Sequence, residues 1–200
     1  MKKNKVSIIT IFFLLLLSAA ATTMAYFTYW KMFNNTFSVG ENKIKITEEY
    51  TPPKEMQEGD NIYKKKIQIE NTGTVPCYVR VFTEFSDSTV RDTSFLSPNG
   101  SDYYPATQYK NHLPEEWVYI ADEENALLGG YYYYTKPLNQ KAVTVPLFKT
   151  VKTHFETANE IKDYEIIVYA ESVQVLDKNG SAFEGDTPYT AAWTEFLERR

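Results

Sequence analysis

Residues 77–85 alternate between two faces, which is the pattern of a β-strand lying on a hydrophobic core. One face is mainly apolar and consists of Cys77, Val79, Val81, Thr83 and Phe85. The opposite face consists of Tyr78, Arg80, Phe82 and Glu84. Because successive side chains of a strand point to opposite sides, this period of two predicts a half-buried strand. A chain that contains such a strand needs a sheet around it.

Several other segments have apolar or alternating patterns of strand length. They span residues 36–39, 43–47, 64–70, 117–121, 131–135, 141–145 and 163–175. Turn-forming residues separate many of them, as at Asn71-Thr72-Gly73, Pro98-Asn99-Gly100, Gly129-Gly130 and Asn179-Gly180. Many short strands joined by turns are typical of an all-β fold. We therefore expect a single antiparallel β-sandwich.

Helix is expected mainly at the C-terminus. Residues 189–200 have apolar side chains at spacings of three and four, which predicts a short helix packed on the sheet. These side chains are Trp193, Phe196 and Leu197. Residues 111–116 and 155–161 are each expected to form a helical turn. Residues 86–109 have no regular period and are expected to form a long excursion between strands.

The N-terminus has the three parts of a secretory signal peptide. Three lysines precede an apolar run at 6–17, and mostly small residues follow at 18–25. We expect a signal helix at 1–25, cleavage between Ala25 and Tyr26, and one β-sandwich domain at 26–200. An uncleaved signal anchor is the alternative, because residues 6–25 are uncharged and about 20 apolar residues span a bilayer. Both alternatives place the domain outside the cell, either secreted or on the cell surface.

Charge and cysteine content exclude several classes of protein. The chain has 26 acidic and 21 basic residues, and three of the basic residues lie in the signal segment. Such an acidic domain is poorly suited to nucleic acid, which is bound by neutralising phosphates, or to an anionic membrane surface. Contact with the membrane is therefore expected only through the signal or anchor segment. Cys77 is the only cysteine, so no intrachain disulfide forms. We expect Cys77 to be a buried apolar side chain; the alternative is a reactive thiol.

No motif predicts catalysis, a metal or a cofactor. The only histidines, His112 and His154, lie far apart in the sequence and outside any His-Glu-x-x-His pattern. The sequence also lacks a Gly-x-Ser-x-Gly elbow and a glycine-rich phosphate loop. Two acidic stretches, at 122–125 and 177–181, contain oxygen ligands of the kind that calcium binds. For the second of these, a hairpin turn at Asn179-Gly180 is the favoured interpretation.

Four consecutive tyrosines are candidates for surface contact. Alternation places Tyr131 and Tyr133 on one face of a strand, and Tyr132 and Tyr134 on the other. We expect one pair to pack in the core and the other to provide a rigid, amphipathic contact surface. A pocket for a small molecule is the alternative.

A set of short motifs, in this order, resembles a known family. The motifs are Ala25-Tyr26-Phe27-Thr28, Asn35-Thr36-Phe37-Ser38-Val39-Gly40, Asn71-Thr72-Gly73, Pro76-Cys77-Tyr78-Val79-Arg80-Val81, Gly130-Tyr131-Tyr132-Tyr133-Tyr134, Pro146-Leu147-Phe148, Ala170-Glu171-Ser172-Val173-Gln174 and Ala191-Ala192-Trp193. Together they resemble the TasA/camelysin-like exported proteins of Gram-positive bacteria, whose signals are removed by a SipW-type signal peptidase. The resemblance is strongest to the branch known as alternate signal-mediated exported proteins.

The resemblance implies a jelly-roll-like β-sandwich and, as partners, a signal peptidase and other copies of the same chain or other matrix proteins. Its best-known members form extracellular fibres in a biofilm matrix by donating an N-terminal strand to the next subunit. Some camelysin-like members are labelled metalloproteases, but the residues of this chain give no support for that activity. The C-terminus also lacks a Leu-Pro-x-Thr-Gly sorting signal.

We therefore expect a non-enzymatic structural subunit of the cell surface or extracellular matrix. Residues 26–39 are the candidate assembly strand because they contain no acid and are rich in aromatic side chains. The candidate residues are Tyr26, Phe27, Tyr29, Trp30, Phe33, Phe37 and Val39. The alternative for this segment is the first strand of its own sandwich. The alternative function is a monomeric surface-binding or accessory module that contacts its ligand through residues 86–109 and the tyrosines.

Overall fold

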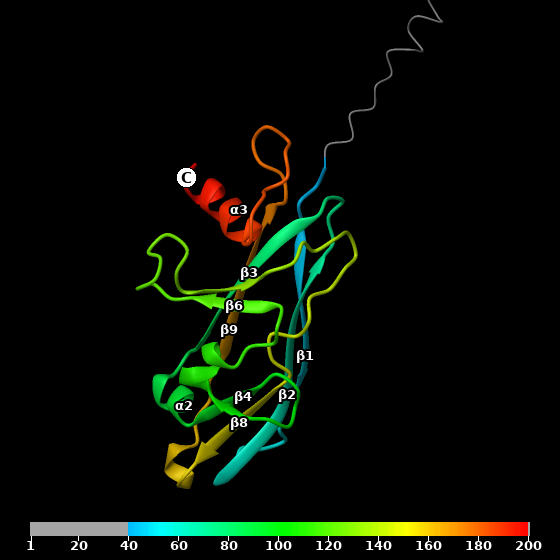
Figure 1. The fold of residues 1–200 in the computed structure, drawn as a ribbon. Coiled ribbons are helices and arrows are strands. Elements are labelled where there is room, and N and C mark those ends of the chain that lie inside the picture. Colours follow the sequence, from blue (N-terminus) through cyan, green and yellow to red (C-terminus); the bar gives the residue numbers. More distant parts are fainter. Residues whose placement is uncertain (1–39, 200) are drawn as a thin grey trace, which may run out of the picture. The chain divides into compact units, whose positions relative to one another are not determined.

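Two antiparallel sheets contain most of the regular structure in residues 40–199, the part of the chain that the computed structural model describes (Figure 1). The first sheet has the order β1-β2-β8-β4-β5, formed by Ile44–Thr51, Gly59–Asn71, Thr150–Phe155, Ser94–Ser97 and Tyr104–Pro105. The second has the order β6-β7-β3-β9, formed by Trp117–Ile120, Tyr131–Tyr134, Cys77–Phe85 and Ile166–Gln174. The predicted all-β sandwich is confirmed.

The chain wraps around the sandwich in the manner of a jelly roll. The consecutive strands β2 and β3 lie in different sheets, and they pair with β8 and β7, which are also consecutive. An early pair of strands is thus rolled up with a late pair, which is the arrangement that defines jelly-roll folds. The strands β1 and β9 extend this roll, β1 beside β2 and β9 beside β3.

Short helices complete the fold. They are α2 (Ser88–Asp92), η1 (Ala106–Asn111), η2 (Ala158–Glu160) and α3 (Pro188–Leu197). The Asp87 side chain caps α2 by accepting the N–H groups of Thr89 and Val90. Helix α3 confirms the predicted C-terminal helix and lies beside β9 and β3 (Figure 1). It begins with Pro188, whose missing N–H has no intrahelical partner to lose in the first turn.

Two apolar clusters hold these layers together. The larger fills the sandwich, and its fully buried members include Ile67, Ile69, Val79, Val81, Leu147, Phe148 and Val151. The smaller lies between the outer face of the second sheet and α3, with Tyr78, Tyr133, Val173 and Trp193 among its members. Because each fully buried side chain of this size contributes roughly 1.5–3 kcal/mol, these clusters supply most of the stabilisation.

The individual strand predictions had mixed outcomes. The strand predicted at 77–85 coincides with β3. The segment 141–145, predicted as a strand, contains only an isolated bridge between Val143 and Glu70. Strand β8 was not predicted, and residues 86–109 contain α2, β4, β5 and most of η1 rather than an irregular excursion.

The signal segment, the cleavage site at Ala25 and Tyr26, and the candidate assembly strand at 26–39 lie outside the described residues. Their assignments therefore stay predictions. Within residues 40–199, no helix combines the length and hydropathy that crossing a membrane requires.

Candidate functional site

The terminal strands of the two sheets, β1 and β9, lie near each other along one side of the sandwich. Two hydrogen bonds join them where β1 begins. The Asn42 side-chain amide donates to the Ser172 carbonyl over 3.1 Å, and the Ser172 hydroxyl donates to Asn42 Oδ1 over 2.9 Å. Within residues 40–199, neither strand has a second neighbour in its own sheet. Unpaired edges of this kind are where an additional strand can bind.

The surface of β1 is covered by charged cross-strand pairs. Glu48 pairs with Lys65, and Glu49 pairs with both Lys64 and Lys66 of β2. Hydrogen bonds from Lys64 and Lys66 lower the pKa of Glu49 to about 2. Charged side chains on an edge strand oppose unspecific pairing with other chains. The β1 edge is therefore protected.

The edge of β9 has no such protection. The strand contains neither lysine nor proline, and Ile167 and Tyr169 are about half exposed, at 48% and 50%. It is also nine residues long. Its one charged residue, Glu171, is largely buried in an ion pair with Arg80. Long edges with exposed apolar residues are the ones that pair with other chains, so β9 is the better candidate for accepting a strand over the residues before Ser172, whose carbonyl Asn42 already binds.

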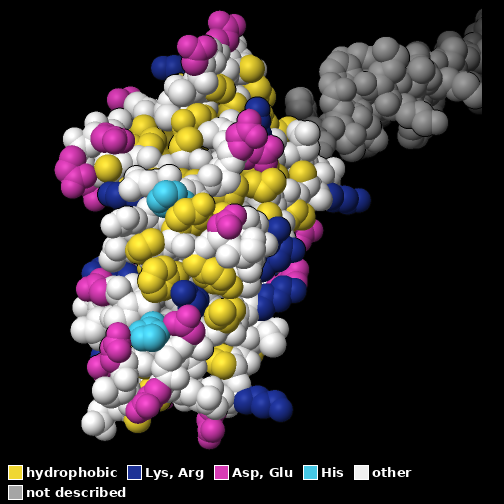
Figure 2. Space-filling view, turned by 60° about the horizontal axis from the view of Figure 1, so that its bottom comes forward, with side chains coloured by type: hydrophobic (Ala, Val, Ile, Leu, Met, Phe, Trp, Pro, Cys, Tyr) yellow, Lys and Arg dark blue, Asp and Glu magenta, His cyan; other side chains and the backbone are white. Residues whose placement is uncertain are grey.

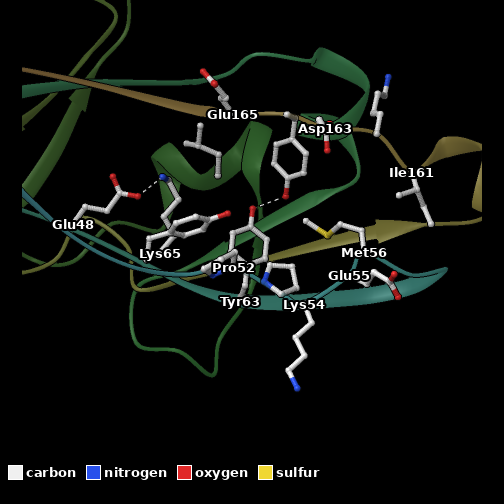
Figure 3. A pocket seen from close by; sticks show the side chains of 15 residues that line it. Glu48, Pro52, Lys54, Glu55, Met56, Tyr63, Lys65, Ile161, Asp163 and Glu165 are labelled. Carbon is white, nitrogen blue, oxygen red and sulfur yellow. Dashed lines mark hydrogen bonds and ion pairs between the residues drawn. The ribbon is translucent and has the colours of Figure 1, made fainter.

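A groove of about 820 Å³ opens beside the start of β9 (Figure 3). Its walls are the end of β1, the following loop through Met56, the centre of β2, and the segment 161–166 that leads into β9. In Figure 3 the side chains of Met56 and Tyr63 lie toward its middle, whereas the Lys54 side chain points away. Charged side chains line much of the rest of the groove, among them Glu48, Lys65, Asp163 and Glu165.

A chain of hydroxyl groups runs from this groove into the core. Tyr63 shares a short hydrogen bond with Tyr164, and Tyr164 contacts Thr153 Oγ1 at 2.8 Å. Thr153 in turn contacts the hydroxyl of buried Ser94 at 2.8 Å. Burial raises the pKa of both tyrosines, so both phenols are protonated at neutral pH. This network joins the floor of the groove to the core through uncharged hydroxyl groups.

The tyrosine run is placed differently from the expectation. Tyr132 and Tyr134 do pack in the core between the sheets, as predicted for one pair. Tyr133 is also buried, under α3, and Tyr131 is only half-buried beside it. The other pair, Tyr131 and Tyr133, was predicted to form a surface contact, and this is wrong for Tyr133 because α3 covers that face of the sheet.

The remaining chemical candidates are separate side chains. Cys77 is fully buried and free, as predicted. His154 pairs with Asp60, and His112 stacks on Tyr104 with ring centres 3.9 Å apart. Figure 2 shows the two histidine side chains at separate places on one face. Within residues 40–199, no group of three His, Cys, Asp or Glu side chains is placed to hold a metal ion.

The second candidate calcium stretch forms a turn. The Asp177 carboxylate accepts the backbone N–H groups of Asn179 and Ser181, each over 2.8 Å. Leu176 and Ala182 bridge across the turn, and Gly180 takes the positive φ of 81° that favours glycine. The carboxylate oxygens are thus engaged with their own loop, and the hairpin-turn interpretation is confirmed.

No family model matches the chain, and no curated protein matches it. The sequence alone did not predict the residues of the groove. Tyr63 and Tyr164 are 101 residues apart, and only the pairing of the sheets brings them together. The available signal was the run of alternating residues in 59–71, in which Asn61, Tyr63, Lys65, Ile67 and Ile69 share the buried face.

Proposed function

We propose that the protein is an exported structural subunit of the cell surface or extracellular matrix, which assembles by adding a strand from one copy to the edge of another. The observation that carries the proposal is the β9 edge, with exposed Ile167 and Tyr169 near its start and a groove beside its first residue. A strand that binds there gains main-chain hydrogen bonds from β9 and buries alternate side chains in the groove.

The apolar part of the groove supports an extended occupant with apolar side chains. Tyr63, Met56 and Ile166 provide apolar surface, and the tyrosine hydroxyls are already hydrogen-bonded to each other. Residues 26–39 of another copy have matching chemistry, because they are aromatic and contain no acid. They directly precede the first described residue, so a connection to the folded domain is short.

The test compares protein that begins at Tyr26 with protein that begins at Glu41, using size-exclusion chromatography with light scattering and negative-stain microscopy. We expect filaments that depend on concentration from the first and monomers from the second. Equal assembly of both proteins contradicts strand donation. A monomer at every concentration from the Tyr26 protein contradicts the structural-subunit proposal and favours a surface-binding module.

A matched pair of lysine substitutions tests the β9 edge itself. Ile167→Lys introduces a charge beside the proposed pairing edge, whereas Leu127→Lys introduces it in the loop between β6 and β7, away from both edges of β9. Both side chains are about half exposed, so both variants should fold. We expect Ile167→Lys alone to prevent filaments. Loss of filaments in both variants, or in neither, contradicts pairing at β9.

A further inference from the structure

Strand β3 has an open edge along its last residues. Its pairing with β9 continues to Phe85 and Ile166, but its pairing with β7 includes only Arg80 and Val81. Alternate residues of a strand direct their backbone groups to opposite edges, so residues 83–85 have N–H and C=O groups with no strand beside them on the β7 side. Among residues 40–199, no loop or side chain forms a hydrogen bond to the backbone of 83–85 outside the β9 ladder.

A cavity of about 420 Å³ lies beside this open edge. It is bounded by Phe82–Phe85 of β3, by Leu96 of β4, by η1, and by Tyr119 of β6. The open edge consists of three extended residues and is therefore roughly 10 Å long. Ligand cavities in proteins start at about 300 Å³. The space therefore suits a short stretch of extended peptide.

One cation in the cavity lacks a carboxylate partner. Lys110 of η1 lies over Tyr119, with its ammonium 5.3 Å from the ring centre, and forms no ion pair with any carboxylate in residues 40–199. Arg91, also in the lining, binds Asp92 through Nε and Nη2. Glu84 is the acidic member of the lining and is exposed. An incoming carboxylate would give Lys110 the partner that it lacks.

We propose that this cavity binds an extended peptide of a partner protein, which pairs with residues 83–85 and places a carboxylate at Lys110. Main-chain pairing supplies affinity, and the carboxylate supplies specificity. The carboxylate is either an acidic side chain or the C-terminus of the peptide. The site is distinct from the β9 edge, and residues 26–39 do not fit it because they contain no acid.

The proposal is tested on protein that begins at Tyr26. Fluorescence anisotropy measures its binding of fluorescein-labelled pentapeptides. The probes are Thr-Val-Asp-Val-Thr with an amidated C-terminus, Thr-Val-Asn-Val-Thr with a free C-terminus, and Thr-Val-Asn-Val-Thr amide without a carboxylate. We expect one of the first two to bind at least tenfold more tightly than the third. The preferred probe then identifies whether the side chain or the terminus supplies the carboxylate.

Two further measurements separate strand pairing from simple charge attraction. Lys110→Met should weaken the preferred probe about tenfold, whereas Lys136→Met removes an exposed lysine outside the cavity and should have no effect. Hydrogen exchange at residues 83–85 should slow at least tenfold when the probe binds. The proposal would be overturned if all probes bound equally tightly, or if Lys110→Met and Lys136→Met weakened binding equally. It would also be overturned if a probe bound without slowing hydrogen exchange at residues 83–85, or if no probe bound at millimolar concentration.

Discussion

Arg80 of β3 and Trp193 of α3 lie face to face, with the guanidinium carbon 4.3 Å from the centre of the indole ring. The guanidinium carbon also lies 4.0 Å from the centre of the Tyr131 ring. Glu171 forms an ion pair with the same group, which is only 4% exposed. These contacts join the terminal helix to the sheet, because cation–π contacts strengthen when the cation is desolvated. Arg80 also donates a hydrogen bond to the hydroxyl of Tyr133, which lies in the same buried cluster as Trp193.

Replacing Arg80 by methionine should destabilise the fold strongly. The substitution breaks the ion pair between Arg80 and Glu171, whose side chains are 4% and 13% exposed, and breaking a buried pair costs roughly 3–5 kcal/mol. Urea unfolding measures the loss. Arg91→Met is the matched control, because its pair with Asp92 is exposed and contributes at most about 1 kcal/mol. Similar losses in both variants would show that Arg80 is no more important than a surface arginine.

Cys77 should be unreactive in the folded protein. Burial raises the pKa of its thiol to about 11, and the thiolate is the reactive form. We therefore expect iodoacetamide at pH 8 to label the folded chain very slowly and the urea-unfolded chain rapidly, as followed by mass spectrometry. Rapid labelling of the folded chain would contradict the buried position and revive a role for the thiol.

The sequence predicted those parts of the fold in which side-chain alternation is undisturbed. Residues 77–85 became β3 because each apolar side chain of the inner face meets the core. Strand β8 has the same alternation, with Val151, Thr153 and Phe155 buried, but threonine, lysine and histidine made the segment look polar. Burial of Thr153 depends on its hydroxyl partners, Ser94 and Tyr164, which the local sequence does not reveal.

The segment 141–145 illustrates the opposite error. Its apolar residues suggested a strand, and it does run beside β2, where the Thr144 N–H donates to the Ile69 carbonyl over 2.9 Å. However, the Thr144 hydroxyl accepts the Ile69 N–H in place of a backbone carbonyl, and Pro146 has no N–H to continue a ladder.

The candidate groove could not be predicted for a different reason, since it forms only where β1, β2 and the segment leading into β9 meet.

The pair of His154 and Asp60 should stabilise the fold most at mildly acidic pH, and its contribution should fall at both higher and lower pH. A hydrogen bond of 2.7 Å raises the pKa of His154 above its ordinary 6.5 and lowers the pKa of Asp60 below 3.8. The contribution of His154 is therefore full below pH 6.5 and is lost as pH rises through its folded-state pKa. The contribution of Asp60 is full above its ordinary pKa and is lost as pH falls through the lowered value.

Asp60→Asn tests this pair directly, because it removes the largest cause of the shift in His154. We expect NMR titration to give a lower pKa for His154 in the variant than in the wild type. Glu123→Gln, in the loop between β6 and β7, is the control and should leave His154 unchanged. An unchanged pKa in Asp60→Asn would mean that nearby Glu156 sets the histidine's charge instead.

Gly73→Ala should disturb the entry of the chain into β1. A Cβ atom at this position would lie 2.2 Å from the Glu41 carbonyl oxygen and 2.7 Å from the Lys43 nitrogen. Both neighbours are backbone atoms, so no side-chain rotation relieves the contact, and overpacking of this kind typically costs about 1–3 kcal/mol. The Gly73 N–H also donates to the Lys43 carbonyl over 2.9 Å, and this bond should weaken as the strands separate.

The control for this prediction is Gly59→Ala, where φ is +84° and no atom lies within 4 Å of the added Cβ. That variant should lose roughly 1–2 kcal/mol through backbone strain alone, so total stability does not separate the two substitutions. Hydrogen exchange does, because only Gly73→Ala moves residues 41–43, whose Asn42 holds Ser172 at the β9 edge. We expect faster exchange at 41–43 in Gly73→Ala and unchanged exchange there in Gly59→Ala. Equal hydrogen exchange at residues 41–43 in the two variants would mean that Gly73 is needed for the turn between β2 and β3 and not for the contact between β1 and β9.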